Sequence, residues 1–164
     1  MQFSRLALVL ILSAVSQMFS SCSSPGQNSN VANSSAANSA TIRQTGPKDN
    51  IEELGLLVRL PFEPDEVAWD ENPEQKKLTA VIRFSPENAT KMGAEIAKNG
   101  QPALETVTVE SWYPNELIAQ GELTGQSIVK GQSYPAEPYL NPPYTKGKIT
   151  RIENTDYFIL QISS

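Results

Sequence analysis

The chain has 164 residues, of which 39% are hydrophobic, and its formal net charge is −5. It contains no histidine and one cysteine, which excludes Ser-His-Asp and Cys-His catalysis and zinc or copper sites that depend on those ligands. The acidic balance argues against nucleic acid as a partner, and no P-loop or G-x-G-x-x-G motif indicates a nucleotide. We expect no cofactor, so any catalysis would depend on carboxylate, tyrosine, lysine or serine groups.

Residues 1–21 have the layout of a secretory signal peptide. Arg5 and the terminal amine supply a positive start, and an apolar run follows over residues 6–15. That run is shorter than the roughly 18 residues that a lasting membrane helix needs. Small residues then precede Cys22, as expected near a cleavage site.

The residues Phe19-Ser20-Ser21-Cys22 resemble a bacterial lipobox, although phenylalanine stands where leucine is usual. The resemblance implies a diacylglyceryl thioether on Cys22, cleavage before it, and often a third acyl chain such as palmitate on the new amine. Two chains give stable anchoring to a lipid bilayer. In a Gram-negative cell, serine after the cysteine would imply the outer membrane. We therefore expect a lipid-anchored protein of the bacterial cell envelope.

Two alternatives to lipidation are a secreted protein with a free thiol and a retained membrane helix. The lone cysteine lies at the end of the signal and none lies in the domain, which argues against the first alternative. Ser13, Ser16 and Gln17 shorten the apolar run and argue against the second.

Residues 22–50 are rich in serine, asparagine and alanine and have no helical or strand period. Such a segment buries too little apolar surface to offset its ordering entropy, so we expect a disordered tether after the lipidated cysteine. A flexible coil of this length spans roughly 30 Å root-mean-square. The alternative is a docking strand near Ile42. Residues 51–164 then form a single domain.

The first part of the domain predicts two strands around an acidic loop. Residues 54–60 form an apolar run, which predicts a strand, and residues 78–84 alternate as a second strand. We interpret residues 63–74 as a solvated loop that Val67 and Trp69 pin to the core. The carboxylates of this loop are Glu63, Asp65, Glu66, Asp70, Glu71 and Glu74.

The clearest helix is predicted over residues 85–98. Ser85 is a good N-cap, Pro86 fits the first turn, and Asn99-Gly100 ends the helix. One side of this helix is apolar and should face a sheet. The apolar stripe is formed by Ala89, Met92, Ile96 and Ala97.

The remaining elements are mostly strands. We predict strands over residues 106–112, 126–133, 148–153 and 157–162, helical turns over 115–120 that end before Gly121, and a bulge at Gly131. This order predicts an α+β fold, with a mainly antiparallel sheet of about five or six strands and one principal helix on one face. The alternative is a small β-barrel with one helix.

The acidic loop offers two kinds of chemistry besides the solvated-loop interpretation. Oxygen-rich loops hold Ca²⁺, but the ligand spacing of an EF-hand loop is missing here. Two carboxylates that face each other across a cleft could hydrolyse a glycosidic bond, and sequence does not fix such geometry. We favour the solvated loop.

Residues 134–144 combine three tyrosines with four prolines. A stiff segment with large aromatic faces suits recognition of a sugar, peptide or protein, and a neighbouring Trp-Tyr pair could join it. The competing interpretation is a polyproline-like crossover that buries its tyrosines against the sheet. The candidate partner-binding or ligand-binding residues are Trp112, Tyr113, Tyr134, Tyr139 and Tyr144.

Basic residues are sparse in the domain. Two spots stand out, Lys76-Lys77 and the pair Lys146 and Lys148. We interpret both as solubilising charges at strand ends.

Two classes of function remain. The first is a membrane-anchored envelope lipoprotein with a non-catalytic domain that binds an envelope protein or glycan, or supports envelope assembly. The second is a small carboxylate-dependent hydrolase that acts on cell-envelope glycan. The second requires two carboxylates in one cleft, at a separation of about 5 to 10 Å.

Overall fold

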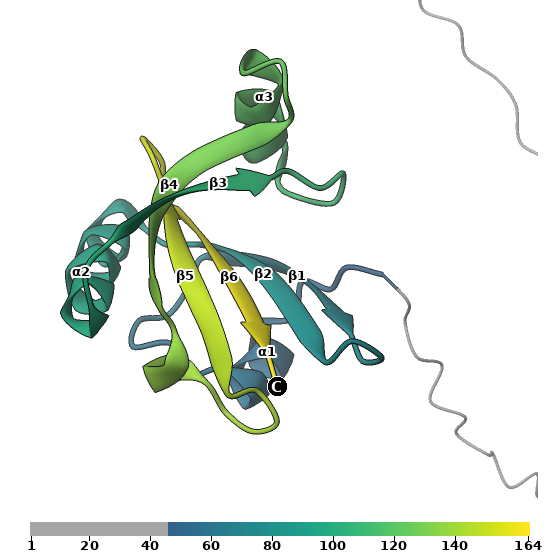
Figure 1. Ribbon diagram of the computed structural model, residues 1–164, viewed down its shortest axis with the longest axis vertical. Helices are drawn as coiled ribbons and strands as arrows, with labels where there is room; N and C mark the ends of the chain where they lie inside the picture. Colours follow the sequence, from purple (N-terminus) through teal and green to yellow (C-terminus); the bar gives the residue numbers. More distant parts are fainter. Residues whose placement is uncertain (1–45) are drawn as a thin grey trace, which may run out of the picture. The chain divides into compact units, whose positions relative to one another are not determined.

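The computed structural model describes residues 46–164 (Figure 1). The predictions for the signal peptide, Cys22 and most of the tether lie outside the described residues. Within residues 46–164, no helix is long and apolar enough to cross a membrane.

In the described part of the chain, six antiparallel strands form one sheet in the order β1-β2-β6-β5-β4-β3. Its two edge strands, β1 and β3, do not pair with each other, so the sheet is open and the barrel alternative is wrong. The predicted α+β fold with an antiparallel sheet is confirmed. The strands are β1 (Glu66–Asn72), β2 (Lys77–Arg83), β3 (Ala103–Thr108), β4 (Ile128–Pro135), β5 (Lys146–Ile152) and β6 (Tyr157–Ser163).

Helices lie on both faces of the sheet (Figure 1). One face, here called the apolar face, is covered by α1, α2 and residues 134–144. The opposite face, here called the groove face, is covered by α3 at one end only. The helices are α1 (Ile51–Leu57), α2 (Pro86–Ile96) and α3 (Asn115–Leu123), with short 3-10 helices η1 (Ala97–Asn99) and η2 (Glu137–Tyr139).

The first predicted strand is wrong, because residues 51–57 form α1. The Asn50 side chain accepts a hydrogen bond from the Glu53 backbone N–H at 2.9 Å, which satisfies an otherwise unpaired donor of the first turn. Acidic residues in that turn also interact favourably with the positive end of the helix dipole. A local cap therefore outweighs the strand-like run of leucine and valine.

The interpretation of residues 63–74 as a loop is also wrong, because β1 occupies most of this stretch. Val67 and Trp69 are fully buried on the apolar face, as predicted. Glu66 precedes them and Asp70 and Glu71 follow them, so the period of two is present in the sequence but is masked by charge.

Other predictions hold with shifted boundaries. Strands β2, β4, β5 and β6 and helix α2 are confirmed, and the Ser85 side chain caps α2 by accepting from the Asn88 N–H at 3.3 Å. Ala97, predicted in the apolar stripe, is exposed. Strand β3 lies earlier than the predicted range 106–112, and α3 continues through Gly121.

Gly131 does not form the predicted bulge. It pairs in regular register with Glu105 on β3 and with Ile152 on β5. A Cβ atom at this position would lie 2.3 Å from the backbone oxygen of Arg151. Because Gly131 has no side chain, β4 and β5 can approach each other closely at this position.

Candidate functional site

The five aromatic candidates lie on opposite faces of the sheet. Tyr134, Tyr139 and Tyr144 are buried in the core of the apolar face. Trp112 and Tyr113 lie on the groove face, beside α3. The structure thus does not bring the five side chains together.

Each tyrosine of the 134–144 segment has a hydrogen-bond partner. The Tyr144 hydroxyl donates to the Glu71 carboxylate at 2.6 Å, and the Tyr134 hydroxyl donates to the Gln132 side chain at 3.2 Å. The Tyr139 hydroxyl accepts from the Asn99 amide at 3.0 Å. These three side chains pack and bond as core residues do.

A polar groove of about 430 Å³ opens on the groove face. Its floor includes Thr79 of β2, Gln161 of β6 and Lys148 of β5, which are direct cross-strand neighbours. Strand β3 and the segment that follows it, up to Tyr113, form a wall of the groove. The remaining lining residues are Asp70, Glu105, Thr106, Val107, Thr108, Glu110, Trp112 and Tyr113.

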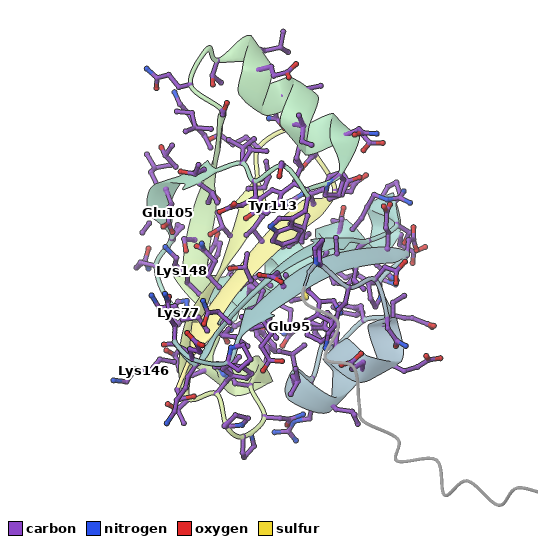
Figure 2. The ribbon with its side chains drawn as sticks, turned by 90° about the vertical axis from the view of Figure 1, so that its right-hand side faces the viewer. Lys77, Glu95, Glu105, Tyr113, Lys146 and Lys148 are labelled. Carbon is purple, nitrogen blue, oxygen red and sulfur yellow. The ribbon has the colours of Figure 1, made fainter. Side chains whose placement is uncertain are left out.

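An ion pair between Glu105 and Lys148 joins β3 to β5 across this groove. In Figure 2 the two side chains lie next to each other on one side of the sheet. Strands β3 and β5 are not hydrogen-bonded neighbours, since β4 lies between them. The contact therefore requires the sheet to curve, and both side chains line the groove.

Tyr113 is the most buried aromatic side chain of the groove, with 4% of its surface exposed. Its ring packs edge-on against the Trp112 ring, with centroids 4.6 Å apart. Burial and the nearby charge of Glu110 raise the pKa of Tyr113 to about 12. The phenol is therefore a neutral hydrogen-bond donor at physiological pH.

No group within residues 46–164 forms a hydrogen bond with the Tyr113 hydroxyl. Every fully buried side-chain oxygen or nitrogen in that part of the chain has a partner. It follows that the Tyr113 hydroxyl is not fully buried, and Tyr113 is one of the residues that line the groove. This is the main chemical difference between Tyr113 and the tyrosines of the apolar face.

The carboxylates of the acidic stretch do not gather around one point. Glu66 forms an ion pair with Arg83 at 2.9 Å, Glu71 accepts from Tyr144, and Asp70 lines the groove. Across residues 46–164, no group of three or more acidic or other metal-ligating side chains is close enough to hold a metal ion.

Two further cavities differ from the groove in chemistry. A larger one, of about 530 Å³, lies between α1 and residues 58–64 and is lined mainly by apolar side chains. The other, of about 420 Å³, lies at the turn between β5 and β6. The polar groove alone among these three combines aromatic rings with donors and acceptors from several strands, so we take it as the candidate site.

Sequence reasoning missed most of the groove. Thr79 and Gln161 are polar residues within otherwise apolar strands, and this pattern could have marked them. Their juxtaposition with Glu105 and Glu110 depends on strand order and curvature. No family model, curated protein or solved structure matches this chain, so the site rests on its geometry.

Proposed function

We propose that this protein is a lipid-anchored envelope protein whose domain binds a glycan in the polar groove. The observation that carries the proposal is the composition of that groove. Hydroxyl, amide, carboxylate and ammonium groups converge there from β1, β2, β3, β5 and β6, beside two aromatic rings. A ligand with many hydroxyl groups needs such a mixture of donors and acceptors.

The aromatic pair supports a saccharide in particular. Sugar rings present apolar C–H faces as well as hydroxyl groups, and rigid aromatic rings give contact area at low entropy cost. Trp112 and Tyr113 supply the rings, and the free Tyr113 hydroxyl supplies a donor. Thr79 and Gln161 add hydrogen-bonding groups on the floor.

The proposed binding is tested by calorimetric titration of the full chain, purified in detergent, with soluble cell-wall oligosaccharides. Tyr113→Phe removes only the free hydroxyl, and we expect binding to weaken about tenfold, because a lost hydrogen bond in a desolvated site costs this much. Tyr134→Phe is the matched control, since the same atom is lost on the apolar face. Equal affinities for both variants, or no binding by the parent chain, would contradict the proposal.

The proposed anchor depends on the lipobox resemblance of residues 19–22. Intact-mass analysis of the protein from a bacterial host should find a diacylglyceryl group on Cys22 at the mature amino terminus. The variant Cys22→Ser should leave the membrane fraction. An unmodified thiol in the membrane-bound protein would rule out this anchor.

A second candidate is glycan hydrolysis in the same groove. Asp70, Glu105 and Glu110 all line it, and Glu105 is already paired with Lys148. Asp70 and Glu110 are then the acid and base candidates. We expect Asp70→Asn and Glu110→Gln to abolish release of reducing ends from cell-wall glycan while binding persists. If the parent chain releases no reducing ends, hydrolysis is excluded and binding remains.

A further inference from the structure

Two basic spots that lie about 70 residues apart in the sequence meet at one end of the groove face. Ser163 on β6 pairs with Lys77 on β2 and with Lys146 on β5. The two lysines therefore flank Ser163 on either side. They are not independent strand-end charges, as the sequence alone suggests.

These lysines belong to the same face as the groove. Lys77 is two residues from Thr79 on β2, and Lys146 is two residues from Lys148 on β5. Side chains two residues apart on a strand point to the same side, and Thr79 and Lys148 both line the groove. The cationic end is thus continuous with the groove floor. Figure 2 shows all three lysines on one side of the domain.

The spacing of the lysines suits one anionic group. Neighbouring strands are about 4.8 Å apart, so the Cα atoms of Lys77 and Lys146 lie about 10 Å apart. Lysine carries its ammonium on a long flexible stem with three donors. Both ammonium groups can therefore reach a carboxylate held above Ser163.

The charges of this end are available for a ligand. Lys148 is paired with Glu105, whereas Lys77 and Lys146 are exposed and form no ion pair within residues 46–164. Asp70 on β1 is the cross-strand partner of Thr79 on β2 and also lines the groove. It forms no ion pair with Lys77 or Lys146. In a chain with a net charge of −5, two lysines that form no ion pair within residues 46–164 thus lie together at one end of the polar groove.

We infer that the ligand of the groove is an acidic glycan, whose carboxylate binds between Lys77 and Lys146. Its hydroxyl groups then lie along Thr79, Gln161 and Tyr113. This inference rests on the proposed glycan-binding function and names the class of glycan. Asp70 and Glu110 line the groove further along and repel negative charge close to them, so the carboxylate that contributes most to binding is expected at the two lysines.

The test compares tetragalacturonate with neutral galactotetraose, titrated into the full chain at about 50 mM and about 300 mM salt. The parent chain should bind the acidic oligosaccharide more tightly, and the difference should shrink at high salt. The double variant Lys77→Gln/Lys146→Gln should bind tetragalacturonate about tenfold more weakly and galactotetraose within about twofold of the parent chain. The control Lys98→Gln/Lys130→Gln changes the net charge equally at positions outside the groove lining and should leave both affinities unchanged.

A third variant tests the inference by gain of binding. Glu105→Gln releases Lys148 from its ion pair, so affinity for tetragalacturonate should rise about threefold. If the lysine double variant binds both oligosaccharides like the parent chain, the acidic-glycan inference is overturned and glycan binding stands. If the parent chain binds neither oligosaccharide, the acidic-glycan inference and the proposed glycan binding are both overturned.

Discussion

The two faces of the sheet use similar residue types for different purposes. The apolar face buries Trp69, Phe84 and Phe158 under two helices and the 134–144 segment. The groove face has a smaller apolar cluster at the α3 end, and beyond it polar side chains line a cavity. A dense group of tyrosines and prolines in the sequence therefore marks the core, while scattered polar residues mark the candidate site.

Tyr144 and Tyr113 show the contrast in one residue type. Both have 4% of their surface exposed. The Tyr144 hydroxyl donates a hydrogen bond to Glu71, whereas the hydroxyl of Tyr113, a residue that lines the groove, has no partner in the described part of the chain. Burial alone does not separate a structural tyrosine from a binding one, but the state of the hydroxyl does.

The largest effect should come from truncating the core of the apolar face. Phe158 is fully buried and packs edge-on against Phe84, with centroids 5.4 Å apart. Phe158→Ala should lower the free energy of unfolding by about 3–5 kcal/mol, because it removes the ring and leaves a cavity. Gln161→Ala, on the groove face of the same strand, should cost less than about 1 kcal/mol. Urea unfolding followed by circular dichroism gives both values, and similar losses would refute the division between the faces.

A smaller effect is expected where β4 and β5 approach most closely. The methyl group of Gly131→Ala would lie 2.3 Å from the Arg151 backbone oxygen, so β5 must shift. We expect a loss of about 2 kcal/mol in the free energy of unfolding. Gly55→Ala is the control, since its methyl group meets no atom within 4 Å and lies in α1. That change should stabilise the protein by about 0.5–1 kcal/mol. An unchanged free energy of unfolding for Gly131→Ala would mean that β4 and β5 are farther apart at this position than the structure shows.

Alkaline pH should lower the stability of the domain gradually. Burial raises the pKa values of Tyr113 and Tyr157 from 10.0 to about 12, and the charges of Glu110 and Glu116, respectively, add to the rise. Between these values the unfolded chain has lost the proton and the folded chain keeps it, so the free energy of unfolding falls as pH rises above about 10. The Tyr139 and Tyr144 pKa values are raised in the same direction.

The variant Tyr113→Phe isolates one contribution to this pH dependence. Its free energy of unfolding, measured by urea titration between about pH 9 and about pH 11, should decline less steeply than that of the parent chain. An unchanged slope would show that Tyr113 does not hold its proton in the folded state.

The smallest effect compares the two hydroxyl groups directly. Tyr144→Phe removes the hydrogen bond to Glu71, and we expect a loss of about 1 kcal/mol in the free energy of unfolding. Tyr113→Phe removes no hydrogen bond formed within residues 46–164 and should change stability by less than about 0.5 kcal/mol. Thermal and urea unfolding at neutral pH distinguish the two. A larger loss for Tyr113→Phe would indicate that its hydroxyl has a structural role.

The elements that could be predicted have strong local features. Helix α2 begins with Ser85-Pro86, and β2 and β6 show clear apolar patterns. Helix α1 and strand β1 were not predictable in this way, because a capping residue outweighs strand propensity in one and carboxylates mask the alternation in the other. Both errors involve a conflict between local features.

The groove could not be predicted because no local feature defines it. Its lining extends from Asp70 to Gln161, and strand order makes neighbours of Thr79, Gln161 and Lys148. Trp112 and Tyr113 were identified as candidates from the sequence, but together with tyrosines that belong to the other face. Thr79 and Gln161 are polar residues within largely apolar strands, and this pattern is the feature that sequence analysis could have used.

Binding in the polar groove is tested most directly by a map of ligand-induced NMR shifts on the full chain titrated with tetragalacturonate. Glycan binding in the polar groove should produce the largest changes in backbone amide shift at Thr79, Tyr113 and Gln161, with smaller changes at Lys77 and Lys146. Changes concentrated at Tyr139 and Leu140, or along α1, would contradict it.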